Sequence, residues 1–169
     1  AQVVFSFGAN FLETWLSPLP YTRGFVCLRE AETKIRGTFV QFEARMSQTA
    51  SKADEWIPLR PGTEGLVALA IGRLVAEAKG GVIPDAFALI DPLMAASESG
   101  VKLETLERIA NILVEAHHPL AIPGGAALGQ SNGLATAESV LALNAQVGNF
   151  GLPGGVFVSP LSPNQGEYH

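Results

Sequence analysis

Short apolar runs that alternate with longer helical patterns constrain the fold of this 169-residue chain more than any other feature. Residues 3–7 are almost wholly apolar, and residues 38–43 are rich in β-branched and aromatic side chains. Apolar residues recur at helical spacing over residues 64–79, 103–116 and 136–147. Short strands separated by helices are typical of a parallel sheet covered by helices. We therefore predict an α/β fold that is doubly wound around a mostly parallel sheet.

Shorter elements complete this pattern. We predict a very short strand at residues 56–59, a partly helical connection over residues 84–95 and a buried strand at residues 119–122. A helix is also expected to begin at Asn10, because four apolar residues follow it at helical spacing: Phe11, Leu12, Trp15 and Leu16.

The composition excludes several functions. Hydrophobic residues make up 47% of the chain and charged residues only 16%, against roughly 25% in an ordinary soluble domain, so part of the surface is expected to be covered by other protein. A net charge of −5, with 11 basic residues that form no stripe, argues against a nucleic-acid partner. No apolar stretch approaches the roughly 18 residues of a membrane span. Cys27 stands alone, so this chain builds no disulfide and no four-cysteine cluster, and we expect a buried structural thiol.

The two ends predict a segment excised from a larger multidomain protein. Residue 1 opens directly into a strand without an initiator Met or a targeting signal, and the chain stops in a polar run. We assign residues 1–158 to one partial domain and residues 159–169 to a polar tail or linker. The segment itself is expected to be soluble.

In a doubly wound sheet, ligands bind beyond the carboxyl ends of the strands, and three turns of this chain have suitable chemistry there. The first turn contains Gly8, which lets the backbone approach a phosphate or a ring closely, and Asn10, which offers a donor and an acceptor. Glu13 follows three residues later. An Asn helix cap with Glu13 as its capping partner explains the same residues.

The second turn follows the strand at residues 38–43. Glu43 stands where an acidic residue can accept hydrogen bonds from ribose hydroxyls or from a guanine edge. Arg45, Ser47 and Thr49 carry donors suited to phosphate oxygens. A solvated acidic strand end is an equally good explanation of Glu43.

The third turn precedes the long helix and consists of Arg60, Pro61, Gly62, Thr63 and Glu64. Free backbone amides at the start of a helix attract anions, and Arg60 adds a full positive charge. An ordinary Pro–Gly turn with Thr63 as the helix cap remains an alternative. Together, three such turns favour a dinucleotide-type ligand.

The other polar motifs give weaker evidence for a binding site. His117 and His118 end a helix with no third metal ligand nearby in sequence, so hydrogen bonds to exposed carbonyls explain them better than a metal. Gly124 and Gly125 are predicted to form a turn and no phosphate loop, because no Gly-Lys-Ser/Thr follows. Residues 131–133 are expected to form a turn, with a lesser chance of lining the ligand.

Four of these stretches match motifs of one family in order and rough spacing. Residues 7–15 resemble its Gly-x-Asn turn, residues 42–49 its acidic-Pro-Arg-x-x-x-Thr element, and residues 53–64 its segment before the long helix. Residues 143–155 match its Asn-x-x-x-Gly-Asn-x-Gly-x-Pro-Gly-Gly signature. The chain thus resembles the molybdopterin oxidoreductase (dimethyl sulfoxide reductase) family, and most closely the iron–sulfur and molybdopterin-like subunits of respiratory complexes such as alternative complex III.

The resemblance implies a Rossmann-like domain that holds one arm of a bis(molybdopterin guanine dinucleotide) cofactor. Ala44 departs from the family, which usually has Pro there, and Glu64 replaces a common Asp. The implied cofactor-binding residues are Gly8, Asn10 and Glu13 in the first turn, Glu43 facing guanosine, Arg45, Ser47 and Thr49 near the phosphates, and Arg60, Pro61, Gly62, Thr63 and Glu64 completing the nucleotide pocket.

The resemblance also implies a parent oxidoreductase that couples molybdenum chemistry to an iron–sulfur chain in respiratory electron transfer. No catalytic residue, molybdenum ligand or cluster cysteine is identifiable in this chain, so the iron–sulfur cluster is expected in the parent only. The expected partners are the remaining domains of the parent together with iron–sulfur and membrane subunits, and the parent is expected to be exported and membrane-associated through them. Two alternatives stay open: a scaffold domain of a quinol-oxidising complex that has lost the molybdenum cofactor, and a free-standing nucleotide-binding module of another Rossmann-like family.

Overall fold

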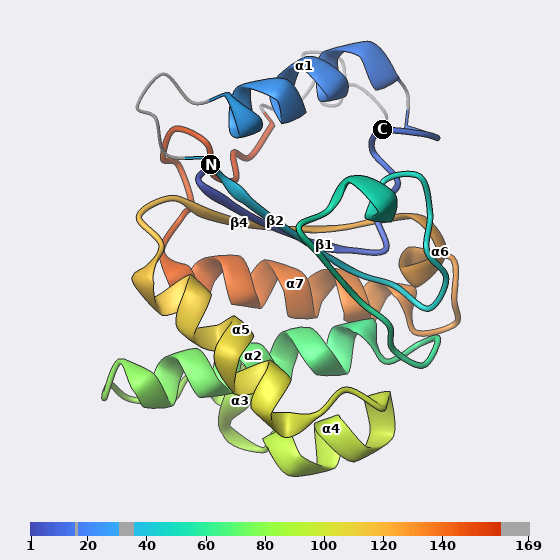
Figure 1. Ribbon diagram of the computed structural model, residues 1–169. Helices are drawn as coiled ribbons and strands as arrows, with labels where there is room; N and C mark the ends of the chain where they lie inside the picture. Colours follow the sequence, from blue (N-terminus) through green and yellow to red (C-terminus); the bar gives the residue numbers. More distant parts are fainter. Residues whose placement is uncertain (16, 31–35, 160–169) are drawn as a thin grey trace, which may run out of the picture.

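A parallel four-stranded sheet forms the centre of the computed structural model, which describes residues 1–15, 17–30 and 36–159 (Figure 1). β1 lies inside the sheet and pairs in parallel with both β2 and β4, so that Phe5 stands between Val40 and Ala121. The predicted α/β fold with a parallel sheet is confirmed. The strands are β1 (Val3–Phe7), β2 (Thr38–Phe42), β3 (Glu55–Ile57) and β4 (Pro119–Pro123), in the order β3-β2-β1-β4.

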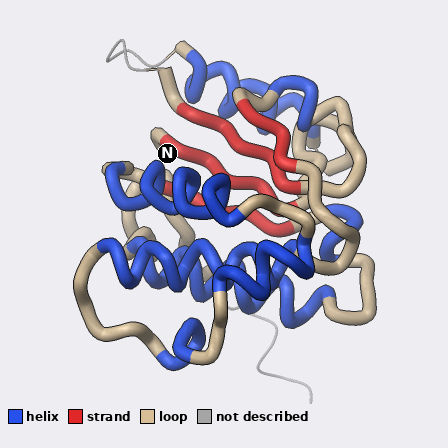
Figure 2. Tube along the Cα trace, turned by 60° about the horizontal axis from the view of Figure 1, so that its bottom comes forward, coloured by secondary structure: helices blue, strands red, loops and turns tan. Residues whose placement is uncertain are grey.

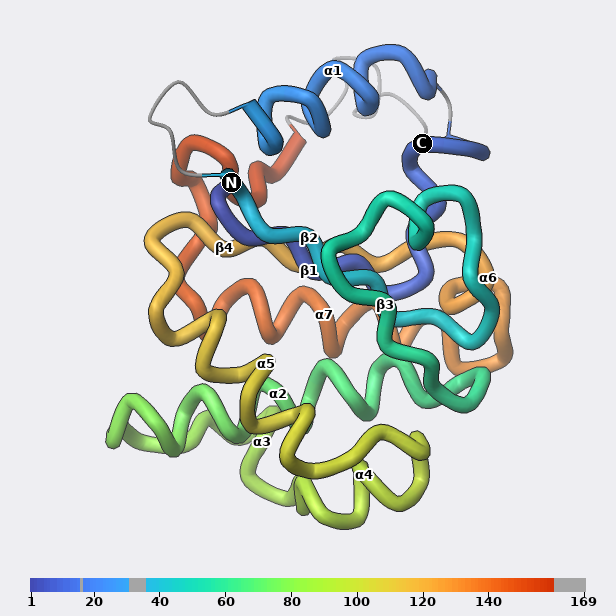
Figure 3. Tube along the Cα trace, in the orientation of Figure 1, coloured from blue at the N-terminus to red at the C-terminus, as the bar shows by residue number. Residues whose placement is uncertain are grey.

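Helices cover both faces of the sheet, as Figure 2 shows. Helices α2, α5 and α7 lie on one face and α1 on the other, while α3 and α4 lie beyond α2 (Figure 3). Within the described ranges, every helix falls short of the length and hydropathy that crossing a bilayer requires. The helices are α1 (Pro18–Arg29), α2 (Glu64–Ala78), α3 (Asp85–Ala88), α4 (Pro92–Ser99), α5 (Leu103–Glu115), α6 (Gly125–Leu128) and α7 (Gly133–Val147), with a 3-10 turn η1 (Ala50–Lys52).

The helices that the apolar spacing predicts are confirmed with small shifts at their ends. α2 and α5 begin and end within a residue or so of their expected bounds, and α3 and α4 make up the partly helical connection. α7 begins at Gly133, three residues before its predicted start at residue 136. β3 covers residues 55–57 in place of the predicted 56–59, because Pro58 has no amide to continue the ladder.

The main core lies between the sheet and the α2–α5–α7 layer. Alternate residues of β1 point to this side, and Phe5 and Phe7 are fully buried there. The Phe7 ring stacks on that of Phe42 with centroids 4.7 Å apart. Ile71 and Leu143 from the helices close the cluster. This packing fixes the carboxyl ends of β1 and β2 side by side.

The helix predicted to begin at Asn10 is wrong. The amides of Glu13 and Thr14 donate to Asn10 O in a turn that does not propagate, and the helix starts only at Pro18. Pro18 has no amide to donate to residue 14, and a proline also disfavours helical geometry in the residue before it. Leu16, part of the misleading pattern, lies outside the described residues.

Helix α1 covers its face of the sheet only loosely. None of its residues is buried, and an apolar cavity of about 550 Å³ separates it from the sheet. Trp15, Phe25 and Ile122 line this cavity. The predicted burial of Cys27 is wrong: this residue is exposed on α1, because the helix packs on the sheet through Phe25 and Leu28, which are themselves only partly buried.

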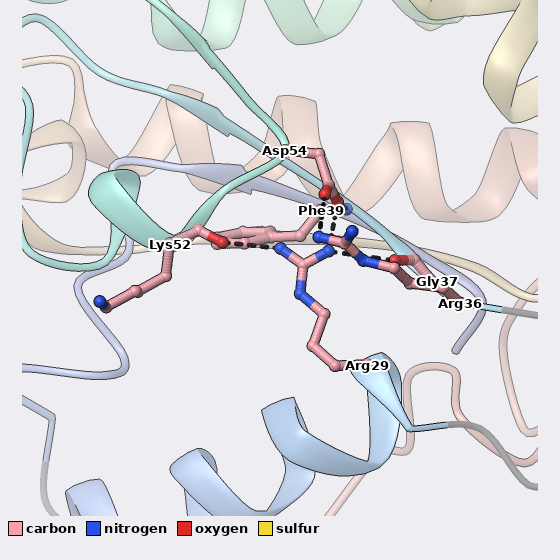
Figure 4. A network of polar contacts seen from close by, with 6 residues as sticks. All are labelled: Arg29, Arg36, Gly37, Phe39, Lys52 and Asp54. Atoms are coloured by element: carbon pink, nitrogen blue, oxygen red, sulfur yellow. Dashed lines mark hydrogen bonds and ion pairs between the residues drawn. The ribbon is translucent and has the colours of Figure 1, made fainter.

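An ionic cluster fixes the carboxyl-terminal end of α1, as Figure 4 shows. The Asp54 carboxylate accepts hydrogen bonds from Arg29, from Arg36 Nη2 at 2.8 Å and from the Phe39 amide at 2.8 Å. Arg29 Nη2 also donates to Lys52 O at 2.6 Å. Burial pushes the pKa of Asp54 upward, but the Phe39 amide and the two guanidinium groups outweigh it and hold that pKa below its ordinary value.

Candidate functional site

The carboxyl ends of β1 and β2 bring all three predicted turns to one pocket of about 170 Å³. The strand order reverses at β1, so the pocket lies at the position where doubly wound sheets bind their ligands. The pocket is lined by Gly8 and Asn10 from the first turn, by Glu43, Ala44, Arg45 and Ser47 from the second, by Pro61 and Glu64 from the third, and by Ala126, Ala127 and Gln130.

The first turn supplies a close backbone approach and an unsatisfied amide oxygen. A Cβ on Gly8 would stand 2.9 Å from both Ala127 Cβ and Gly124 O, so this glycine lets the turn after β4 approach. The Oδ1 atom of Asn10 is buried and has no hydrogen-bond partner among the described residues. Asn10 therefore presents an acceptor that a ligand can use.

Glu43 is buried and stabilises the second turn. Its Oε1 accepts from the Ser47 amide at 2.5 Å and its Oε2 accepts from Gln41 Nε2 at 2.9 Å. Each carboxylate oxygen retains a further lone pair, so contact with a ligand is still open to Glu43. Arg45, two residues on, is exposed and lines the pocket.

Three predicted site residues connect the first two turns or cap the second. Ser47 lines the pocket, and its Oγ accepts from the Ala50 amide at 3.1 Å. Thr49 Oγ1 accepts from the Leu12 amide at 3.3 Å, and Glu13 Oε2 accepts from the Gln48 amide at 3.3 Å. Thr49 and Glu13 thus hold the first turn against the second and do not line the pocket.

The third turn contributes a buried carboxylate. Glu64 is only 3% exposed, and its Oε2 has no hydrogen-bond partner within the described part of the chain. Glu64 is the first residue of α2, where the helix dipole and free amides stabilise negative charge. Glu64 lines the pocket at the N-terminus of α2.

Arg60, Gly62 and Thr63 of the third turn do not line the pocket. Arg60 donates from Nη1 to Ser97 O at 2.9 Å and to Glu98 O at 3.0 Å, so its guanidinium neutralises the end of α4 outside the pocket. Thr63 is the N-cap residue of α2, as predicted, although its hydroxyl donates to Arg60 O at 2.6 Å and makes no capping hydrogen bond to the helix. Gly62 adopts a positive φ of 85° at the centre of the turn.

A fourth turn forms the remaining wall, although the sequence indicated a lesser chance of lining the ligand only for residues 131–133 at its end. It runs from residue 124 to residue 132, and Ala126, Ala127 and Gln130 line the pocket. Asn132 Nδ2 donates to Gly62 O at 2.8 Å and joins this turn to the third. The signal that could have found it is topological: β4 is a parallel neighbour of β1, so its carboxyl end must meet the same edge.

The histidine pair lies elsewhere. His117 and His118 precede β4 and therefore stand at the opposite edge of the sheet from the pocket. Nowhere in the described ranges do three His, Cys, Asp or Glu side chains form a group that could hold a metal ion.

An all-parallel sheet with helices on both faces and a pocket at its switch point defines the class of the chain, a doubly wound α/β segment. No family model matches the chain. The menaquinone reductase molybdopterin-binding-like subunit of Nitratidesulfovibrio vulgaris is 31% identical over 96% of this chain and 24% of the relative. The arsenate respiratory reductase molybdopterin-containing subunit of Chrysiogenes arsenatis is 45% identical over 40 residues, which are 24% of this chain and 5% of the relative.

The fold has a solved counterpart in the acetylene hydratase from Pelobacter acetylenicus. The TM-score is 0.66 with 18% identity, over 86% of this chain and 21% of that one. The chain is therefore similar to one segment of the subunits of molybdopterin oxidoreductases. It spans about a quarter of the length of the first of these relatives.

Proposed function

We propose that this chain holds the guanosine end of a molybdopterin guanine dinucleotide within a larger, iron–sulfur-linked oxidoreductase of respiratory electron transfer. The observation that carries the proposal is a pair of buried acceptors without partners, Asn10 Oδ1 and Glu64 Oε2, in residues that line one pocket. A buried polar atom without a partner costs about 1–3 kcal/mol. A ligand that brings N–H or O–H donors removes that cost.

A guanine nucleoside fits this requirement. Guanine presents its N1–H and its N2 amino group side by side, and ribose adds hydroxyl donors, whereas a phosphate presents only acceptors. The volume of about 170 Å³ is suited to a base or a sugar, and the rest of the dinucleotide would extend beyond the pocket. The buried carboxylates Glu43 and Glu64 also disfavour a phosphate inside it.

The phosphates would lie nearer the exposed guanidinium of Arg45, at the rim of the second turn. Ser47 and Thr49 would act mainly by shaping that turn, since both hydroxyls already accept backbone hydrogen bonds. Arg60 would support the third turn through α4. When bound, the cofactor would supply two-electron chemistry at molybdenum, and the residues of this chain would hold and orient its nucleotide end.

The names of the relatives support this proposal. Two subunits are described as molybdopterin-binding-like and molybdopterin-containing, and both belong to reductases. With one cysteine in the chain, an iron–sulfur cluster would be held by other parts of the parent. Its partners would be those remaining domains and iron–sulfur and membrane subunits, through which an exported parent would reach the membrane.

Metal and pterin analysis of the purified full-length parent tests the proposal. We expect near-stoichiometric molybdenum or tungsten together with the fluorescence of oxidised pterin. Iron without molybdenum, tungsten or pterin would contradict the proposal and would favour a scaffold domain in a quinol-oxidising complex.

A further inference from the structure

The fourth turn places one polar side chain, Gln130, in the wall of the pocket. A Cβ on Gly62 would stand 2.8 Å from Gln130 Oε1, so the absence of a side chain at Gly62 lets the Gln130 amide lie against the third turn. The neighbouring Asn132 fixes the same approach by donating to Gly62 O. Gln130 and Asn132, two residues apart in the fourth turn, both contact Gly62 and together place this turn against the third.

The backbone around Gln130 is closely packed. The Gly133 amide donates to Gln130 O at 2.9 Å, and a Cβ on Gly133 would stand 2.1 Å from Leu128 O. Any side chain at residue 133 would force this turn open. The turn therefore holds Gln130 in a defined place before a ligand arrives, which lowers the entropy cost of binding.

The chemistry of Gln130 complements that of the buried acceptors. Asn10 Oδ1 and Glu64 Oε2 require donors from the ligand. A glutamine amide also carries a donor, which the place of Gln130 in the pocket wall makes available to a ligand. Guanine presents the acceptors O6 and N7 on the edge next to its N1–H donor.

We propose that Gln130 is a specificity-determining residue whose Nε2 donates to an acceptor of the purine, O6 or N7, while the carboxylate side of the pocket binds its donors. This inference rests on the proposed function. It assigns base recognition to a segment outside the three turns that the sequence motifs indicate.

The test compares variants of the full-length parent purified under identical conditions. Gln130→Glu keeps the size of the side chain and replaces its donor by a negative charge, and Gln130→Met removes both polar groups. Ser131→Ala is the matched control, because Ser131 is exposed on the same turn and does not line the pocket. Acid-released guanine nucleotide per chain is measured by chromatography before and after prolonged dialysis, alongside the thermal unfolding midpoint.

We expect the wild type and Ser131→Ala to retain guanine nucleotide, and both Gln130 variants to lose it about tenfold faster at an unchanged unfolding midpoint. Retention in Gln130→Glu equal to that of the wild type would overturn the role of Gln130 and leave the proposed function standing. An equal loss in Ser131→Ala would also overturn it, because the integrity of the turn would then explain the result. A wild-type parent without guanine nucleotide would overturn both proposals.

Discussion

Asn144 takes the place of a fifth strand beside β4, and its replacement by alanine should be one of the costliest single changes in the chain. Within the described sheet β4 is an edge strand, and the backbone of Ala121 points away from β1. Asn144 Oδ1 accepts from the Ala121 amide at 3.0 Å, and its Nδ2 donates to Ala121 O at 2.8 Å. Both Ala121 and Asn144 are buried.

The magnitude follows from the atoms left behind. Asn144→Ala strips the partners from two buried backbone groups of Ala121 and from Asn149 Nδ2, which donates to Asn144 Oδ1 at 2.8 Å. Asn149 keeps its hydrogen bond to Pro119 O, so the two backbone groups dominate the cost. At about 1–3 kcal/mol for each buried group without a partner, the expected loss is about 3 kcal/mol of unfolding free energy.

Equilibrium denaturation of the chain in urea measures this loss, with Asn111→Ala as the control. Asn111 is exposed on α5, so its replacement should change the unfolding free energy by less than about 0.5 kcal/mol. A loss below about 1 kcal/mol for Asn144→Ala would refute the reasoning, because it would mean that water or relaxed backbone satisfies the edge of β4.

Three further changes test other parts of the structure. Glu64→Gln should raise the unfolding free energy of the ligand-free chain by about 1 kcal/mol, because the cost of burying a carboxylate with an unpartnered oxygen exceeds the helix-dipole stabilisation that is lost at the start of α2, and urea denaturation would show the opposite sign if Glu64 has a partner. Gly62→Ala and Gly80→Ala should each cost about 1 kcal/mol, because both glycines have positive φ and the close contact of a Cβ at residue 62 is with the movable end of the Gln130 side chain; a loss for Gly62→Ala several times that for Gly80→Ala would contradict this. Asp54→Asn should destabilise the chain at neutral pH and not in acid: the folded pKa is depressed, so the stabilisation is present above the ordinary carboxyl pKa of about 4 and disappears as the pH falls through the folded value. A difference between Asp54→Asn and wild type that persists at low pH would show that the carboxylate charge is not the cause.

Much of the fold can be predicted from the sequence where burial of an apolar face determines the local pattern of residues. The apolar faces of α2 and α5 predict helices because both pack against the sheet and must be apolar at helical spacing. Helix α1 cannot be predicted in this way, because none of its residues is fully buried. Its exposed Cys27 was misjudged for the same reason. The helical spacing of Phe11, Leu12 and Trp15 is misleading, since these residues precede the helix and do not form one.

The candidate site shows a similar division. The order of the strands predicts that the turns after β1 and β2 meet, and the pocket at their ends bears this out. Which polar atoms remain free depends on side-chain contacts that spacing does not encode. Glu43 uses one oxygen for Gln41 of β2 and the other for the Ser47 amide of its turn, the Arg60 guanidinium donates to carbonyls at the end of α4, and Glu64 keeps an oxygen without a partner among the described residues. Gln130 enters from a turn that carries no ligand-binding motif.

The loose attachment of α1 has a consequence for how the molecule opens. Its carboxyl-terminal end is held by Arg29 on Asp54, while the rest of the helix packs on the sheet only through the partly buried side chains of Phe25 and Leu28. The free energy of local opening is set by the apolar area and hydrogen bonds that opening breaks, so α1 should detach at a cost far below that of global unfolding. Its backbone amides should therefore exchange with solvent deuterium long before those of α2, and proteases should cut this side of the sheet first.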